Sequence, residues 1–175
     1  MHRFLLLGAS FLFAVSANAQ SVGTASSTQE FVTKAAVGDM FEIQSSKLAQ
    51  QKADAESKKF ASKMVTDHTK TSTELKTLVA GGKVKATLPK EMDSAHKSKL
   101  DKLKGLSGAN FDKEYDDMQR SAHRDAVSLF EQYAKGGENP DLKAFAAKHL
   151  PHLQEHLKLA EGLKSSPTTG TAPAR

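Results

Sequence analysis

The sequence predicts an all-α fold, a four-helix bundle with a long helical crossover between its second and third helices. Apolar residues recur at three-and-four spacing through four long stretches, which is the pattern of helices that bury one face. Glycine pairs and capping residues bound these stretches, and no stretch alternates between apolar and polar residues as a half-buried strand would. The segment between the second and third stretches is long enough to lead the chain from one end of a bundle to the other.

The first two helices are predicted to form an antiparallel hairpin. The first begins near Ser27 or Thr28, with Thr28 as the capping residue, and runs to about Gln51. The second covers roughly residues 54–80 and ends at Gly81-Gly82, where helices favour a left-handed stop. Because the connection is short, the two helices are expected to pack side by side.

Lys83 to Gly108 form the predicted crossover. An amphipathic segment starts at Leu88-Pro89, and its apolar side chains are expected to rest on the bundle: Met92, Ala95, Leu100, Leu103 and Leu106. A connection of this length allows the second and third helices to run parallel.

The remaining two helices follow the crossover. The third covers about residues 110–135, and the fourth opens with Asn139-Pro140-Asp141, a capping residue followed by proline at the first helical position. Pro151 lies inside the fourth helix. Because proline lacks the N–H donor and crowds the preceding turn, a kink or restart is expected near Leu150.

The N-terminus has the pattern of a bacterial secretory signal peptide over residues 1–19, with a basic start, a short apolar run and small residues at Ala17 and Ala19. Cleavage after Ala19 is expected to leave a disordered lead over 20–28, the bundle over 29–164 and a disordered tail over 165–175. The mature chain is therefore expected in the periplasm or outside the cell, without a transmembrane segment.

Composition excludes several classes of function. The formal net charge is +5 and falls to +4 when Arg3 leaves with the signal peptide, and the lysines are scattered among acidic residues as on solvated helix faces. Few aromatic residues and no tryptophan argue against nucleic-acid binding. With no cysteine, the chain has no disulfide, thiolate metal site, iron–sulfur cluster or covalently attached c-type haem.

One polar residue on each helix is expected to face inward: Glu42, His68, His123 and His156. At about 1.5 Å of rise per residue, these residues fall near one level, roughly 15 to 25 Å from the same end of the bundle. Three neutral imidazoles and a carboxylate suit a divalent transition metal, Zn, Cu or Fe. In the alternative interpretation, the same groups bond one another or water and only fix helix packing.

Two other patterns suggest metal binding less specifically. Met64 and His68, four apart on one face, form a soft-plus-imidazole pair that copper could use, with Met118 nearby, although methionine on such a stripe usually fills the core. The run HLPHLQEH forms a second cluster of His149, His152, Glu155 and His156, which is also compatible with a solvated helix face.

The side chain of Asp67 is expected to point in a different direction from that of its neighbour His68. Adjacent residues on a helix point about a quarter-turn apart, so Asp67 is not expected to orient the His68 ring. A bond to Thr71 or a pairing with Lys63 or Lys70 is expected instead.

Four stretches resemble the exported bacterial proteins grouped as domain of unknown function 4142, which look like members of the ferritin-like superfamily. They are FVTKAAVGDMFEIQSSKLAQ, FASKMVTDHTK, LSGANFDKEY with SAHRDAV, and AKHLPHLQEHLKLAEGL. The resemblance implies a ferritin-like four-helix bundle, supports the crossover, and implies almost nothing about activity. Iron-oxidising ferritin-like enzymes carry Glu-x-x-His on two helices. No Glu here has a His three residues later, and the acidic counterpart, Asp93 to His96, falls in the crossover, which argues against iron oxidation or storage.

These observations favour a non-catalytic, periplasmic ferritin-like bundle that binds a metal ion or small ligand, in envelope stress or metal handling. The alternative is an envelope interaction or structural module, in which lysine-rich faces or the crossover meet a protein partner. A third possibility is an oxidoreductase with a mononuclear or copper site. The oligomeric state is not predicted.

Overall fold

The computed structural model describes residues 26–163, and the predicted signal peptide lies outside the described residues, as do most of the predicted disordered ends. Within this range the chain forms α1 (Thr28–Lys52), α2 (Ala55–Ala80), α3 (Ser94–Lys104), α4 (Gly108–Gly136) and α5 (Pro140–Gly162), with no strand. The prediction of an all-α fold is confirmed.

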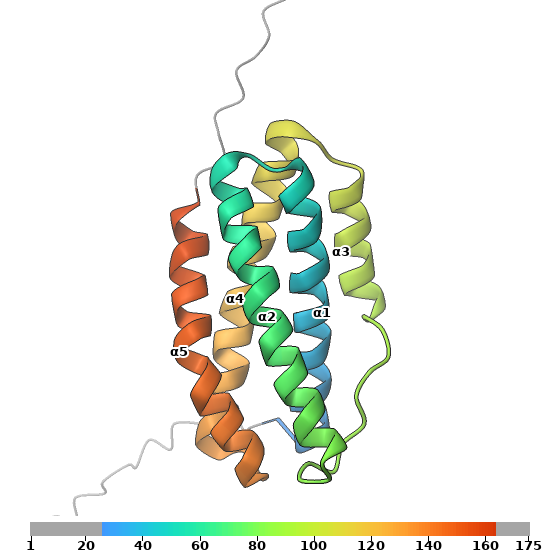
Figure 1. The fold of residues 1–175 in the computed structure, drawn as a ribbon, viewed down its shortest axis with the longest axis vertical. Coiled ribbons are helices and arrows are strands. Elements are labelled where there is room, and N and C mark those ends of the chain that lie inside the picture. The colour runs from blue at the N-terminus through green and yellow to red at the C-terminus, as the bar shows by residue number, and fades with distance from the viewer. Residues whose placement is uncertain (1–25, 164–175) are drawn as a thin grey trace, which may run out of the picture.

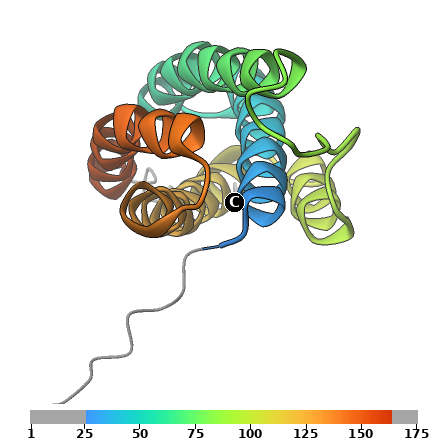
Figure 2. The same ribbon diagram turned by 90° about the horizontal axis from the view of Figure 1, so that it is seen from below.

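The long helices pack as two hairpins, α1 with α2 and α4 with α5 (Figure 1). Seen along the bundle, α1, α2, α5 and α4 surround the core in that order, and α3 lies outside them against α1 (Figure 2). Helices α2 and α4 run in the same direction, because the segment containing α3 carries the chain back along the bundle. This is the predicted crossover.

Capping residues set most of the helix boundaries. Asp54 and Asn139 cap α2 and α5 by accepting bonds from Ser57 N and Leu142 N. Ser27, rather than Thr28, caps α1 by accepting a bond from the Glu30 backbone N–H. In each case a side-chain oxygen satisfies an N–H that has no partner within its own helix.

One predicted helix boundary is wrong. The crossover helix starts at Ser94, after the Asp93 cap, rather than at Leu88-Pro89. Of the kink or restart predicted near Leu150, the restart does not occur, because α5 continues through Pro151, and the ribbon of α5 bends partway along its length (Figure 1). The proline removes one backbone donor, and the packing of both flanking turns keeps the helix intact.

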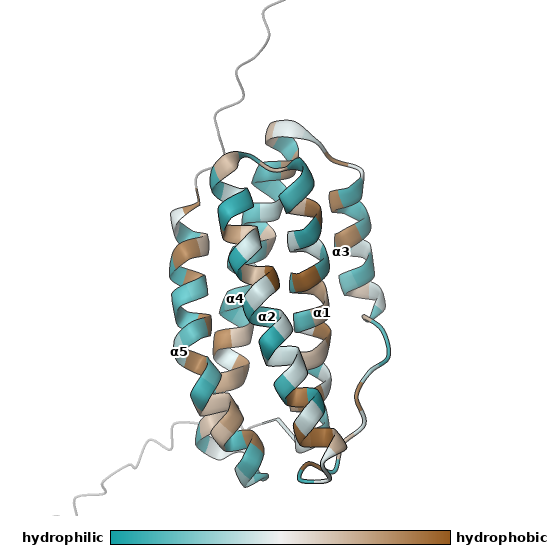
Figure 3. Ribbon diagram, in the orientation of Figure 1, coloured by the Kyte–Doolittle hydropathy of each residue, from teal (hydrophilic) through white to brown (hydrophobic). Residues whose placement is uncertain are grey.

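The core of the bundle consists of two apolar clusters with a polar layer between them, and a third, smaller cluster of Phe41, Met92 and Leu100 lies between α1 and the crossover segment. At one end of the bundle the cluster includes Phe31, Leu75, Tyr133, Leu142 and Phe145. At the other end it includes Ala49, Phe60, Met64, Phe111, Tyr115 and Ala160. Hydrophobic and hydrophilic residues alternate along every long helix, as expected for helices that bury one face (Figure 3). The polar layer lies at mid-height, where each long helix contributes a buried acidic or imidazole side chain.

Among the described residues, no helix is both long enough and apolar enough to cross a membrane.

Candidate metal centre

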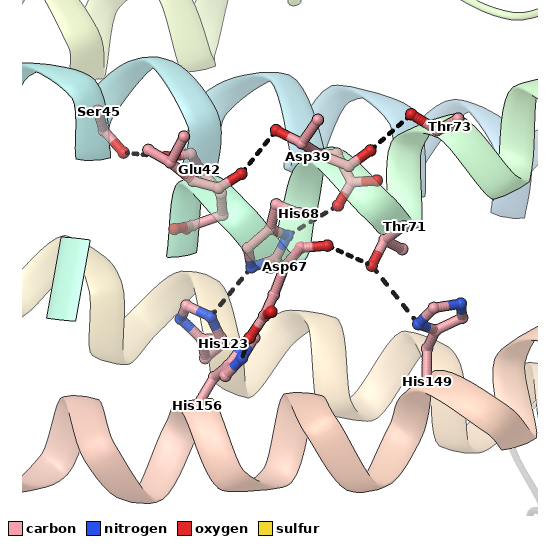
Figure 4. A network of polar contacts seen from close by, with 12 residues as sticks. Asp39, Glu42, Ser45, Asp67, His68, Thr71, Thr73, His123, His149 and His156 are labelled. Atoms are coloured by element: carbon pink, nitrogen blue, oxygen red, sulfur yellow. Dashed lines mark hydrogen bonds and ion pairs between the residues drawn. The ribbon is translucent and has the colours of Figure 1, made fainter. Parts of the chain in front are cut away.

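Three histidines from three helices meet in the polar layer (Figure 4). His68 of α2, His123 of α4 and His156 of α5 are only 4%, 1% and 2% exposed. One ring nitrogen of each lies within 4.8 Å of those of the other two. The structure therefore brings three of the four predicted site residues to one point.

The proton of His123 is assigned by its backbone partner. Its Nδ1 lies 2.9 Å from the carbonyl oxygen of Gln119. Because a carbonyl oxygen only accepts, Nδ1 carries the hydrogen and Nε2 carries the lone pair.

His156 is oriented by Asp67. Its Nε2 lies 3.0 Å from Asp67 Oδ2. Burial raises the pKa of Asp67, but hydrogen bonds from Lys63 and His156 outweigh it and hold the pKa below its ordinary value, so the carboxylate is ionised and accepts. His156 Nδ1 then carries the lone pair, and this buried atom has no hydrogen-bond partner in the described part of the chain.

His68 links the carboxylate of α1 to the other imidazoles. Its Nδ1 lies 2.8 Å from Asp39 Oδ1 and its Nε2 lies 3.4 Å from His123 Nε2. If Nδ1 donates to Asp39, two lone pairs face each other across 3.4 Å, and a cation between them would bind both. If the proton is on Nε2, His68 donates to His123 and the layer is a hydrogen-bonded network. These two arrangements are the two alternatives predicted from sequence.

Burial keeps the three imidazoles neutral. It lowers the pKa of His68 and of His156 to about 4 and that of His123 to about 3. At neutral pH each ring therefore offers one lone pair, which is the form that binds a metal.

Glu42, the fourth predicted residue, lies in the same layer on α1 but outside the three-histidine group. It is 3% exposed, and neither of its carboxylate oxygens has a hydrogen-bond partner among residues 26–163. Burial raises its pKa to about 8. Burial likewise raises the pKa of Asp39, whose Oδ2 also lacks a hydrogen-bond partner there. A buried carboxylate without a partner is costly, so this side of the layer favours a cation or a proton.

The sequence model of the family described as domain of unknown function (DUF4142) matches residues 13–163. The chain belongs to the DUF4142 family. The resemblance to this family stated from the sequence is thereby confirmed. Among solved structures, CopM in its Cu(II)-bound form is similar, with a TM-score of 0.66 and 22% identity over 79% of this chain and 96% of the CopM chain. At that identity the similarity shows the fold alone. No curated protein matches the chain.

The HLPHLQEH run of this DUF4142 chain does not form a second cluster. His156 points into the core, His152 is exposed, and His149 bonds instead to α2, with Nε2 3.0 Å from Glu74 Oε2. His149 and His156 are seven residues apart on a continuous helix and therefore both face α2, two turns apart, so they cannot bind one ion together.

The methionine pattern proves to be packing. Met64 is fully buried in the apolar cluster with Phe60 and Tyr115, and Met118 packs against the same cluster. This is the ordinary role of a methionine on the buried face of a helix.

Two residues that orient the imidazoles were not predicted. Asp67 pairs with Lys63 at 3.1 Å, as expected, but it also bonds His156 across the helix interface. Asp39 was missed although it lies four residues after Ala35 and three before Glu42, on the same inward stripe. That periodicity was the signal that could have identified it.

Proposed function

We propose that this protein binds one divalent transition-metal ion through His68, His123 and His156, as an exported metal-handling protein. The supporting observation is that three buried, neutral imidazoles from three helices bring one ring nitrogen each within 4.8 Å of one another. Their other nitrogens are held by two carboxylates and a backbone carbonyl. Such outer partners fix the tautomer and direction of metal-binding histidines and raise their basicity.

Cu²⁺ and Zn²⁺ are the leading candidates, and Fe²⁺ follows. A site made of imidazoles suits all three ions, and nitrogen ligands bind Cu²⁺ most tightly among the divalent first-row metals. The similar fold of CopM, which was solved with Cu(II), makes Cu²⁺ the first ion to test.

The periplasm is the proposed compartment. The support is the signal-peptide pattern of residues 1–19, and the absence of cysteine is compatible with an oxidising environment. Detection of the processed chain in a periplasmic extract, with an N-terminus at Gln20, would test this assignment.

Metal analysis decides the proposal. Mature protein purified without a histidine tag is expected to take up one equivalent of Cu²⁺ or Zn²⁺, measured by elemental analysis and calorimetry. His68→Ala and His123→Ala should lose this binding. His152→Ala is the matched control, because this histidine is exposed on the same helix as His156. Absence of stoichiometric metal under every loading condition would refute the proposal.

A structural role for the layer is the second candidate. The bond from His68 to Asp39 ties α2 to α1, and that from His156 to Asp67 ties α5 to α2. If these bonds only fix helix register, His68→Leu should keep or raise the thermal stability of the metal-free protein, since an apolar side chain often replaces a buried polar group without loss. A large loss of stability in metal-free His68→Leu would count against this role.

A further inference from the structure

The buried histidines are connected to the surface by a cavity bounded mainly by α1 and α4. It has a volume of about 510 Å³, and His68, His123 and Glu42 line its inner part. Its outer lining includes the exposed residues Lys99 and Asp125. Since the three imidazoles are almost fully buried, an ion from solvent needs such a passage to reach them.

Small residues keep this passage open. Gly38 of α1 lines the cavity, and a Cβ added at this position would contact nothing within 4 Å. Ala122 and Ala126 line the facing side on α4. Larger side chains at these positions would fill the space between the two helices.

Carboxylate oxygens face the inner part of the cavity. Glu42 and Asp39 both line it, and three of their four oxygens have no hydrogen-bond partner within residues 26–163. Both side chains are more than nine-tenths buried. An arriving cation would therefore meet carboxylate oxygens that accept no hydrogen bond. Asp39 lies directly beside His68, and Glu42 lies about one helical turn away on the same face of α1.

The opposite face of the site is different. His156 does not line the cavity, and on its side Asp67 pairs with Lys63 at 3.1 Å while Lys63 also reaches Glu155 at 3.4 Å. A cation approaching there would meet the lysine charge and would have to displace an ion pair.

We propose that the cavity between α1 and α4 is the route by which the metal ion reaches the histidines, and that Glu42 receives the ion on this route. The inference rests on the metal binding proposed above and adds the path and a role for Glu42. A group on the path lowers the barrier for uptake and release alike. Glu42 thus sets the rates of exchange, while the three histidines set the affinity.

Blocking the cavity tests the route. Gly38→Leu should still bind one Cu²⁺ ion with an unchanged Kd, but stopped-flow association and chelator-driven dissociation should both slow by at least about tenfold. Gly162→Leu is the matched control, because Gly162 is also helical with open space around it and does not line the cavity. Its rates should equal those of the wild type, and circular dichroism should show that both variants are folded.

Glu42→Gln tests the receiving group without changing its shape. Association and dissociation of Cu²⁺ should both slow by about tenfold or more, with Kd unchanged, because the amide offers the ion one oxygen instead of two and cannot ionise. A lower affinity with an unchanged association rate would make Glu42 a ligand and overturn its role on the path. If Gly38→Leu loads at the wild-type rate, or Lys63→Ala alone changes the rate, the route is overturned while the metal site stands. Wild-type protein that binds no Cu²⁺ overturns both proposals.

Discussion

The interface between α2 and α5 contains the same histidine–carboxylate pair twice, two helical turns apart. His156 Nε2 bonds Asp67 at 3.0 Å, and His149 Nε2 bonds Glu74 at 3.0 Å. Each carboxylate also holds a lysine, Lys63 in the first pair and Lys148 in the second. Because α2 and α5 are antiparallel, the equal spacing on both helices places the two pairs in register.

The two pairs differ in what their second ring nitrogen meets. His149 Nδ1 lies 3.5 Å from the Thr71 hydroxyl. His156 Nδ1 has no hydrogen-bond partner within the described chain, and the His156 ring lies beside those of His68 and His123, with centroid distances of 5.5 and 5.4 Å. A histidine–carboxylate pair across a helix interface is therefore not by itself a sign of a metal site. The unpartnered ring nitrogen in a group of three imidazoles is the feature that distinguishes one pair from the other.

The largest difference in metal binding is expected between the variants that remove His156 and His149. His156→Ala should weaken Cu²⁺ or Zn²⁺ binding by more than about hundredfold, since loss of a ligand exceeds the effect of losing an outer partner. With metal at about 100 times the wild-type Kd, wild type and His149→Ala should each gain about 2.7 kcal/mol of stability, and His156→Ala should gain almost none. Chemical denaturation with and without metal measures this difference. Equal metal stabilisation of the two variants would remove the distinction between the pairs.

A smaller difference in metal affinity is expected between variants of the two carboxylates, Asp67 and Glu74. Asp67→Asn should lower metal affinity by about 10-fold to 100-fold, because the amide no longer offers a charge to orient and polarise His156. Glu74→Gln, the matched change in the other pair, should leave the affinity within about twofold of the wild type, since its histidine does not face the site. Calorimetric titration of both variants checks this. A loss in Glu74→Gln as large as that in Asp67→Asn would contradict it.

The sequence was sufficient for the fold because its signals are local. Capping residues such as Asp54 and Asn139, and the glycine pair after Ala80, act within one turn and locate helix ends without knowledge of the partners. Helical periodicity also placed His68, His123 and His156 on inner faces. The helix does not restart at Pro151, because tertiary packing on both sides of the proline outweighs its local cost.

The site was only partly predictable because its details depend on contacts between helices. Asp67 points away from His68 on its own helix, as expected, and its bond to His156 follows only from the position of α5. The same holds for Glu42, whose inward position was predicted but whose place beside the histidine group, rather than within it, was not. Periodicity predicts which face is buried, whereas distances across the core depend on helix rotation and spacing.

Acid should destabilise the metal-free protein through the histidine layer. In the unfolded chain each of these histidines has a pKa near 6.5, whereas burial lowers it to about 4 in His68 and His156 and to about 3 in His123. Below about pH 6.5 the unfolded chain therefore takes up protons that the native chain does not, and the free energy of unfolding falls toward about pH 4. Burial raises the pKa of Glu42 and Asp39, which opposes this trend.

Each buried imidazole lowers the free energy of unfolding by up to about 1.4 kcal/mol per pH unit between about pH 6.5 and pH 4, and the two buried carboxyl groups offset part of this loss. Urea unfolding of wild type and variants at about pH 6.5, 5.5 and 4.5 measures the slopes. His156→Leu should flatten the slope, because one buried imidazole is gone, and His149→Ala should keep the layer and its acid sensitivity. A loss in His156→Leu as steep as that of the wild type, or steeper, would be inconsistent with neutral buried rings.

The smallest effect should come from making the second pair resemble the first. Thr71→Val removes the hydroxyl beside His149 and leaves that Nδ1 without a side-chain partner, as in His156. The hydroxyl also donates to the Asp67 backbone carbonyl at 3.1 Å, so two hydrogen bonds are lost, and the expected cost is about 1 to 2 kcal/mol of stability, seen as a lower urea midpoint. No new metal binding should appear, because the group that meets at one point consists of His68, His123 and His156 and does not include His149. A second equivalent of Cu²⁺ bound by Thr71→Val would show that an unpartnered imidazole is enough, and that convergence of several lone pairs is not required.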